Sequence, residues 1–212
     1  MINFEFVSNN PRYRADRCSS CRLPAAHCIC NQTPCIKSRH RFWILIHPNE
    51  LQKPTNTAVL IRRTFHESRL IPWQRSDFSP LIELAQRQGV QPLLAFPGDT
   101  GNAGHQRERW DDAEGATFLL LDGTWRQARR MFRKNAWIRS LPLVSLRPTG
   151  LSQYPLRRQS HPHHLSTVET AVALLREFQD QSAAVELAGY VALFNQAYLA
   201  SKAPRGSGCI PG

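Results

Sequence analysis

The segment ATFLLLDGTWRQARRMFRKN, residues 116–135, decides the fold, because it predicts a buried strand followed at once by a helix. The apolar run ends at Asp122, and Thr124 with Gln127 three residues later has the pattern of a helix-capping box. Gly123 permits a tight turn between the strand and the helix. Asp122 is therefore expected at the exit of a strand, beside the positive end of a helix dipole. Both a structural acid and a catalytic acid fit that position.

The helical pattern after this turn has one apolar face and one basic face. At about 100° per residue, one side collects the apolar residues Trp125, Ala128, Met131 and Phe132. The other side collects four arginines with no acid among them: Arg126, Arg129, Arg130 and Arg133. Neighbouring guanidinium groups repel each other, and phosphate relieves that repulsion. We predict a phosphate-binding surface on the basic side, whereas Trp125 also fits simple core packing.

From Arg41 onward, short apolar runs alternate with helical patterns. The runs cover residues 42–47, 91–97, 116–122 and 141–148. The helical patterns cover residues 56–69, 80–89, 124–135, 166–179 and about 181–201. This alternation predicts an α/β fold, a largely parallel sheet with helices on both faces. Ligands bind beyond the carboxyl ends of such strands, so residues 47–50, 96–99, 122–125 and 146–150 are expected near one rim.

Five of the six cysteines lie between Cys18 and Cys35, which is unlike a disulfide framework spread over a whole chain. Four of them follow the pattern C-x2-C-x6-C-x-C: Cys18, Cys21, Cys28 and Cys30. Four thiolates fill a tetrahedral zinc site and leave no open position, so the predicted zinc is structural. His27 and Cys35 are alternative ligands, and a reduced, metal-free loop is the alternative interpretation. We predict a small cysteine-rich, zinc-binding appendage at residues 1–38 and a larger domain at residues 39–212.

The chain of 212 residues carries 27 lysines and arginines against 16 acids, a formal net charge of +11. Such a field attracts polyanions, nucleic acid before anionic membrane. No window approaches the run of about 20 apolar residues that spans a bilayer, and the first twenty residues lack a signal-peptide core. We expect a soluble, cytoplasmic protein with a nucleic-acid partner, no membrane association and no evident obligate protein partner.

Other polar groups follow the predicted strands or precede the predicted helices. His47 and Glu50 follow the first strand, and residues 54–57 supply hydroxyl and amide groups before the next helix. Ser166 and Glu169 form a second capping box, whose helix start can also hold a carboxylate or phosphate. The segment 156–164 holds Arg157, Arg158 and three histidines, which favours an RNA or ligand loop. Standard Gly-rich phosphate loops and the serine-hydrolase elbow are both absent from the sequence.

Several of these motifs, in this order, resemble one known family. D-G-T-W at 122–125, H-P-N-E at 47–50, T-N-T at 55–57, S-T-V-E at 166–169 and the four-cysteine start at 18–30 resemble the DTW-domain family, the tRNA-uridine aminocarboxypropyltransferases. The resemblance runs from Cys18 to about Phe178. Two departures are Thr170, where a small apolar residue is expected, and the additional Cys35.

The resemblance implies a SPOUT-like fold with a trefoil knot that binds S-adenosylmethionine in its knotted loops. It implies transfer of the 3-amino-3-carboxypropyl group to N3 of a uridine in tRNA, with release of methylthioadenosine. We expect the cofactor at the strand-end loops and the start of the 166–179 helix: Phe96, Pro97, Leu121, Asp122, Gly123, Thr124, Trp125, Leu146, Ser166, Thr167 and Glu169. The remaining motif residues are His47, Glu50, Asn56 and Thr57.

In this transfer the nucleophile, and not the sulfonium group, is the reactant that needs activation by the enzyme. A sulfonium carbon is already electrophilic and its leaving group departs neutral, whereas uridine N3 must lose a proton. Asp122 is the acid inside the signature, so we predict that it is the general base. The tRNA phosphates are expected on the arginines at 126, 129, 130, 133, 157 and 158. An S-adenosylmethionine-dependent RNA methyltransferase and a non-catalytic zinc-containing RNA-binding protein are the alternatives.

Overall fold

A computed structural model describes residues 17–51, 53–74, 79–96, 115–146 and 165–203. Within these ranges the chain forms one sheet of five strands in the order β2-β1-β4-β3-β5. The strands are β1 (Arg41–Ile46), β2 (Arg69–Pro72), β3 (Leu93–Ala95), β4 (Thr117–Asp122) and β5 (Leu143–Val144). Every neighbouring pair in the sheet is parallel, which confirms the predicted sheet type.

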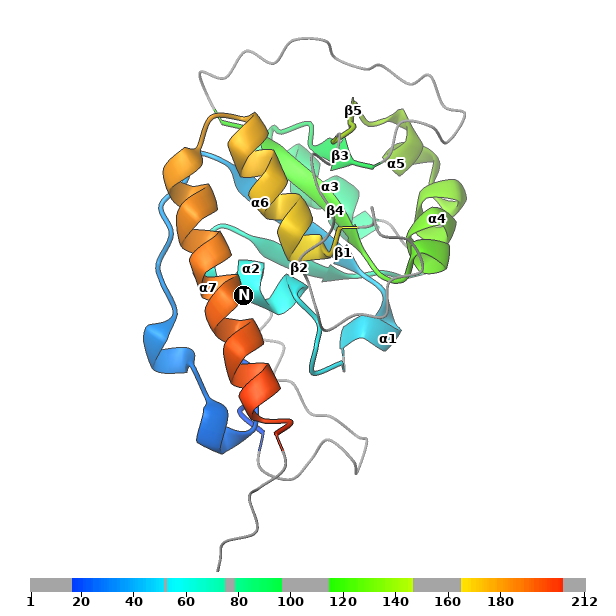
Figure 1. The fold of residues 1–212 in the computed structure, drawn as a ribbon. Helices are drawn as coiled ribbons and strands as arrows, with labels where there is room; N and C mark the ends of the chain where they lie inside the picture. The colour runs from blue at the N-terminus through cyan, green and yellow to red at the C-terminus, as the bar shows by residue number, and fades with distance from the viewer. Residues whose placement is uncertain (1–16, 52, 75–78, 97–114, 147–164, 204–212) are drawn as a thin grey trace, which may run out of the picture.

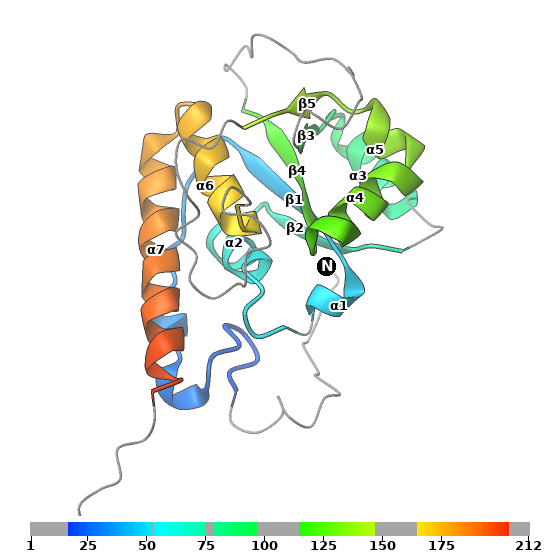
Figure 2. The same ribbon diagram turned by 45° about the vertical axis from the view of Figure 1, so that its right-hand side comes forward.

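Helices cover both faces of this sheet, as predicted (Figures 1 and 2). One face carries α2 (Ala58–Thr64), α6 (Thr167–Glu177) and α7 (Gln181–Ala200). The other face carries α3 (Ser79–Gln88), α4 (Trp125–Lys134) and α5 (Ala136–Ser140). Two short 3-10 helices, η2 (Ala25–His27) and η3 (Cys30–Gln32), precede β1, and the short helix α1 (Pro48–Leu51) follows β1.

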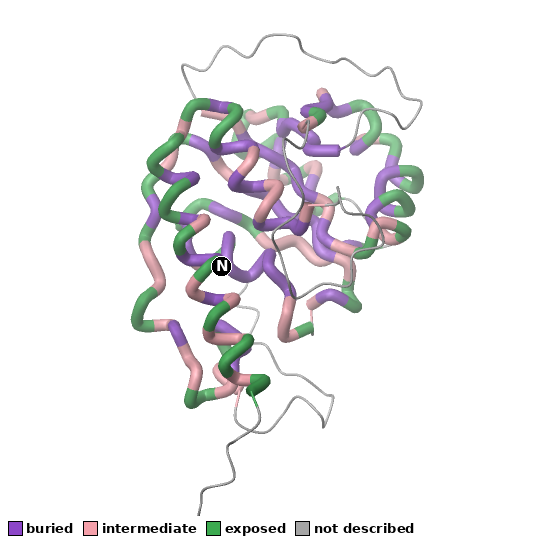
Figure 3. The backbone as a smooth tube through the Cα atoms, in the orientation of Figure 1, coloured by how far each residue is buried: buried purple, intermediate pink, exposed green. Residues whose placement is uncertain are grey.

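Alternating side chains of the central strands fill two separate cores. Phe42, Ile44 and Ile46 of β1 pack with α2, α6 and α7, whereas Trp43 and Leu45 pack with α3, α4 and α5. Because both faces of the strand are covered, its sequence is almost continuously apolar. Full burial of one such side chain stabilises the fold by about 1.5–3 kcal/mol. Figure 3 shows the sheet as a buried layer within exposed helical surfaces.

The four strands expected from the sequence are all present, and β2 is a fifth that the periodicity did not predict. Residues 56–69 read as one helical pattern, but α2 ends at Thr64 and Phe65 turns the chain into extended backbone. β2 lies at the sheet edge, Arg69 is exposed and its other residues are only partly buried, so its sequence lacks the apolar run of a central strand. An edge strand also tolerates Pro72, which cannot donate to a neighbour.

The cysteine-rich segment packs against the rest of the chain. Leu23, Ile29 and Ile36 are buried in the same core as α6 and α7. The hydroxyl groups of Thr33 and Tyr190 of α7 lie 2.9 Å apart. Figure 1 shows this segment beside the lower half of α7. The boundary near residue 38 stays a prediction, and the described part of the segment shares a core with the larger domain.

The strand order places a topological switch point, where a binding crevice is expected, between β1 and β4. The chain leaves β1 through α2 toward β2 at one edge, and leaves β4 through α4 and α5 toward β5 on the other side. In open parallel sheets such a divergence opens a binding crevice beyond the carboxyl ends of the two strands. The two ends are tied together, because the amide of His47 donates to the carbonyl of Asp122 at 2.9 Å. Among the described helices, none is long and apolar enough to cross a membrane.

Candidate active site

Asp122 lies at the centre of this crevice position, where three of the sequence motifs meet. Its side chain is 4% exposed. The amide group of Asn56, which precedes α2, donates to one carboxylate oxygen. The hydroxyl group of Thr167, the first residue of α6, donates to the other. The carboxylate is therefore held from two sides, and those hydrogen bonds stabilise its ionised form.

The residues around Asp122 form a buried polar cluster, which we call the Asp122 cluster. Its members are at most 9% exposed: Arg22, Asn56, Thr57, Asp122, Ser166 and Thr167. The amide of Val168 donates to the hydroxyl of Thr57 at 3.4 Å, so α6 and the segment before α2 also contact each other directly. Glu50 is buried too, and Lys53 donates to it at 2.6 Å. Buried charged groups that lie together at the carboxyl end of a parallel sheet mark a candidate functional site.

Arg22 brings a positive charge from the cysteine-rich segment into this cluster. It is 5% exposed, its φ of 65° lies in the left-handed region, and its Nη1 donates to the carbonyl of Lys53 at 3.2 Å. Burial lowers the pKa of Arg22 to about 10, and the negative charge of Asp122 opposes that shift. Arg22 is therefore still protonated at neutral pH, and the Asp122 cluster contains buried groups of both signs, Arg22 and Asp122.

Asn56 has one side-chain atom without a partner among the described residues. Its Nδ2 donates to Asp122, and this contact fixes the orientation of the amide. Its Oδ1 is buried and has no hydrogen-bond donor in the described part of the chain. A buried acceptor left in this state costs about 1–3 kcal/mol. The side chain can therefore accept a hydrogen bond from a group outside the described residues.

The turn between β4 and α4 has the geometry that its sequence predicts. The Thr124 hydroxyl accepts from the Gln127 amide at 3.3 Å, and the Gln127 side chain accepts from the Thr124 amide at 2.6 Å. A side chain on Gly123 would bring a Cβ to 3.0 Å from Gln127, so this close turn favours glycine. The second predicted capping box is also confirmed, at Ser166 and Glu169 of α6.

His47 is hydrogen-bonded to Gln127 of this turn, and the contacts of its Nδ1 define one tautomer. Because Gln127 Oε1 accepts from Thr124, its Nε2 faces His47 and donates to Nδ1 at 3.2 Å. The amide of Asn49 donates to the same Nδ1 at 3.2 Å. The ring stacks on Trp73 with centroids 5.2 Å apart. Burial lowers the pKa of His47 against the opposing pull of Glu50, so at neutral pH the imidazole is neutral and protonated on Nε2.

Aromatic rings line the same rim on the α4 side. Trp125 stacks on Phe96 with centroids 5.3 Å apart, and Phe96 stacks on Phe132 at 4.8 Å. Trp125 is half-buried, so it packs against the core and also reaches the basic face, where Arg129 lies over its ring at 5.9 Å. Leu121 and Leu146 are half-buried near this core and its neighbour. Pro97 lies outside the described residues.

The basic face of α4 is exposed. All four predicted arginines, at 126, 129, 130 and 133, are exposed, and Lys134 and Arg139 extend the same charge toward α5. The sequence from Trp125 to Ser140 contains no acid. The other two predicted RNA-binding arginines, at 157 and 158, lie outside the described residues.

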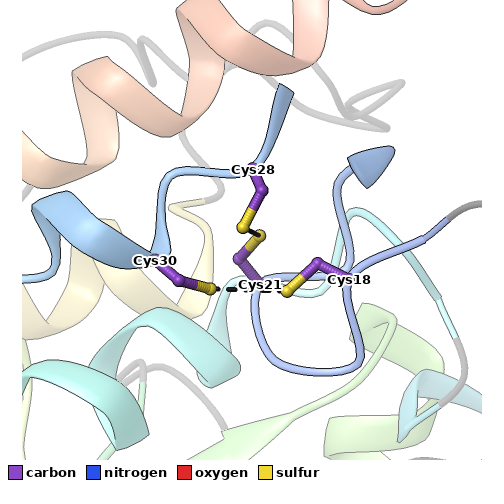
Figure 4. A group of neighbouring side chains, drawn as sticks. All are labelled: Cys18, Cys21, Cys28 and Cys30. Atoms are coloured by element: carbon purple, nitrogen blue, oxygen red, sulfur yellow. Dashed lines mark hydrogen bonds between the residues drawn. The ribbon is translucent and has the colours of Figure 1, made fainter. Parts of the chain in front are cut away.

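The four predicted metal ligands gather in one place (Figure 4). The sulfur atoms of Cys18, Cys21, Cys28 and Cys30 all lie within 4.8 Å of one another. The Cys21–Cys28 pair is separated by 3.8 Å and the Cys18–Cys30 pair by 3.4 Å. A tetrahedral Zn²⁺ with bonds of about 2.3 Å requires sulfurs about 3.8 Å apart. The donor set and its spacing fit a closed tetrahedral metal site.

The acidities of these thiols differ because they share hydrogen bonds. Burial raises the pKa of Cys18, but hydrogen bonds from the backbone of Cys21 and Ser20 outweigh burial and lower that pKa to about 6. Burial and the hydrogen bond with Cys18 raise the pKa of Cys30 to about 12, and burial also raises that of Cys21. Metal binding would replace the remaining protons, so it depends on pH.

Arg22 is the residue of this site that the sequence reasoning missed. The sequence shows only that Arg22 directly follows a predicted metal ligand, Cys21, and that position does not indicate an interaction with Asp122. Gln127 was identified as a cap but not as the partner of His47. Neither contact follows from spacing along the chain, since each joins elements that only the folded sheet brings together.

Comparison with known protein families identifies one domain in this chain. The DTW domain matches residues 15–199. A protein of Drosophila melanogaster named tRNA-uridine aminocarboxypropyltransferase 2 is 28% identical over 80% of this chain and 69% of its own length. Proteins of the same name from Macaca fascicularis and Mus musculus are 29% and 27% identical over 78% and 76% of this chain. The match spans only 57% and 56% of those two proteins. No solved structure matches. The chain belongs to the DTW-domain family.

Proposed function

We propose that this protein is a transferase that moves the 3-amino-3-carboxypropyl group of S-adenosylmethionine to N3 of a uridine in tRNA. The names of its relatives support a tRNA-modifying transferase. The observation that carries the proposal is the convergence of three separate motifs on the Asp122 carboxylate at the crevice between β1 and β4. The SPOUT-like knot belongs to this proposal, and it depends on the path between β5 and α6, which lies largely outside the described residues.

The proposed reaction is a single displacement. Uridine N3 forms a bond to the terminal methylene of the aminocarboxypropyl group while the bond from that carbon to sulfur breaks. The sulfur keeps the electron pair, so methylthioadenosine leaves neutral. The N3 proton passes to Asp122, the proposed general base. An ionised carboxylate has about four acceptor sites, and the donors Asn56 and Thr167 leave lone pairs for that proton.

We assign the binding of S-adenosylmethionine to the rim around this carboxylate. The stacked rings of Phe96 and Trp125 offer an apolar wall beside the DGTW turn, and Leu146 packs against the core on the other face of the sheet. The start of α6, at Ser166, Thr167 and Glu169, brings the positive end of the helix to the same rim, although the amides of Ser166, Val168 and Glu169 already donate within the protein. His47, Glu50, Asn56 and Thr57 complete the rim on the β1 side.

The tRNA would contact the exposed arginines of α4, because four guanidinium groups without acids bind phosphate by charge and by forked hydrogen bonds. Uridine N3 takes part in base pairing, so the target base must be unpaired or extracted to reach Asp122. One tight turn joins Asp122 to α4, so the proposed base and the phosphate contacts keep a fixed relation. A structural Zn²⁺ in the cysteine cluster would hold Arg22 at the same site.

Nucleoside analysis by mass spectrometry tests the proposal. Wild-type protein incubated with tRNA and S-adenosylmethionine should yield an aminocarboxypropyl uridine and one methylthioadenosine per modified base. Asp122→Asn keeps the shape of the side chain and should lower turnover by about 10²–10⁴-fold, the range that one general base contributes. A methylated nucleoside would identify a methyltransferase instead. Full turnover by Asp122→Asn would remove Asp122 from the role of base.

A further inference from the structure

The unpartnered oxygen of Asn56 points to a specific ligand group. Asn56 is 5% exposed, and its amide orientation is fixed because Nδ2 donates to Asp122. Oδ1 therefore faces away from Asp122, and it finds no donor among the described residues. Buried amide oxygens in folded proteins are almost always hydrogen-bonded. The missing donor is therefore expected to come with a ligand.

The charges around Asn56 define what kind of donor fits. The ionised carboxylate of Asp122 is in direct contact with the same amide group, which favours a positively charged donor. The guanidinium group of Arg22 lies within electrostatic range of Asp122 and carries the opposite charge. A simple cation would be repelled by Arg22, and a simple anion by Asp122. A zwitterion, with an ammonium group and a carboxylate on one carbon, complements both.

We infer that Asn56 Oδ1 accepts a hydrogen bond from the α-ammonium group of S-adenosylmethionine, with the α-carboxylate of the same amino-acid end turned toward Arg22. This inference rests on the proposed function and adds a residue that selects its substrate. It also connects the cysteine-rich segment to the reaction, because that segment carries Arg22 into the Asp122 cluster.

The proposed hydrogen bond between Asn56 and the α-ammonium group affects which group of S-adenosylmethionine is transferred. The amino-acid end belongs to the aminocarboxypropyl group and not to the methyl or adenosyl group. If that end is held beside Asp122, the carbon chain that leaves sulfur lies on the side of the proposed base. The hydrogen bond therefore favours aminocarboxypropyl transfer over methyl transfer from the same molecule.

Calorimetric binding of two ligands to three proteins tests the inference. Methylthioadenosine serves as the second ligand because it lacks the amino-acid end of S-adenosylmethionine. Asn56→Ala should weaken S-adenosylmethionine by about tenfold or more, the cost of a lost hydrogen bond to a charged group, and leave methylthioadenosine unchanged. Thr167→Val is the matched control, because it also removes one donor to Asp122 but keeps Asn56 Oδ1. It should weaken S-adenosylmethionine clearly less than Asn56→Ala does.

A second measurement uses only the wild-type protein, in case Asn56→Ala does not fold. An S-adenosylmethionine analogue without the α-amino group should bind at least about tenfold more weakly than the parent compound. Equal binding of that analogue, or an equal effect of Asn56→Ala on both ligands, would overturn the inference and leave the proposed function standing. If Asn56→Ala lowered the affinity for tRNA and left the affinity for S-adenosylmethionine unchanged, Asn56 would contact the target uridine. That result would also overturn the inference. Failure of the wild-type protein to bind S-adenosylmethionine would overturn the proposed function itself.

Discussion

Two regions of this molecule use arginine in opposite ways. Arg22, in the cysteine-rich segment, is 5% exposed and lies within the field of Asp122. The arginines of α4 are exposed and have no acid along their own helix. A buried guanidinium needs a fixed partner, whereas an exposed stripe attracts a mobile polyanion. The same residue type therefore lies beside the proposed general base in one region and would hold the nucleic acid in the other.

The sharpest test of this contrast replaces the buried arginine. Arg22→Gln should lower the free energy of unfolding by about 3–5 kcal/mol, because it leaves the buried charge of Asp122 without its counter-charge. Chemical denaturation measures this loss. Arg133→Gln on the exposed face is the matched control and should change the free energy of unfolding by less than about 0.5 kcal/mol. Equal effects of the two substitutions would erase the distinction between the regions.

Removal of the proposed Zn²⁺ should act through the cysteine-rich segment and Arg22. Treatment with a chelator is expected to lower the melting temperature and the turnover together, since the proposed ligand Cys21 directly precedes Arg22. Metal content, melting temperature and nucleoside yield are measured on the same sample. Cys21→Ser should reproduce the effect.

The control for the metal experiment is Cys35→Ser, because Cys35 is exposed and lies outside the cluster of four. It should retain the metal and the wild-type melting temperature. Loss of metal from this variant would make Cys35 a ligand, and full activity of the metal-free protein would separate the cysteine cluster from the reaction site.

On the exposed face of α4, Arg126→Gln combined with Arg133→Gln should weaken tRNA binding without changing the melting temperature. Each lost phosphate contact reduces the slope of log affinity against log salt by about 1, so the double variant should lower it by about 2. Filter binding at several salt concentrations gives the slope, and S-adenosylmethionine affinity should not change. An unchanged slope would mean that α4 does not contact the tRNA backbone.

The sequence predicted most of the fold because its central strands and helices have strong periodicity. β1 and β4 are buried on both faces, so each is a short apolar run, and α4 and α6 begin at complete capping boxes. β2 was not predicted because an edge strand with partly buried residues lacks that run.

The sequence motifs named several residues of the candidate site, but they did not indicate which of these residues contact one another. The motifs nominated Asp122, Asn56 and Thr167, yet the hydrogen bonds among them join positions 66 and 45 residues apart in the chain. Periodicity describes one element at a time, so it carries no information on such pairs. Arg22 was hidden for the same reason, since its importance depends on a carboxylate from β4.

The smallest expected effect concerns His47, which lies between the two regions, near Glu50, Lys53 and Arg130. Its pKa in the folded protein is lowered, so between that value and the unfolded value of about 6.5 the unfolded chain binds more protons. Stability from this group is therefore present above pH 6.5 and falls as the pH decreases through that window. His47→Gln cannot titrate, so its melting temperature should decline less on acidification than that of the wild-type protein. An NMR titration of the imidazole checks the cause directly: a pKa at or above 6.5 would mean that the attraction of Glu50 outweighs burial and the positive charges of Arg130 and Lys53, and any stability lost on acidification would then come from other groups.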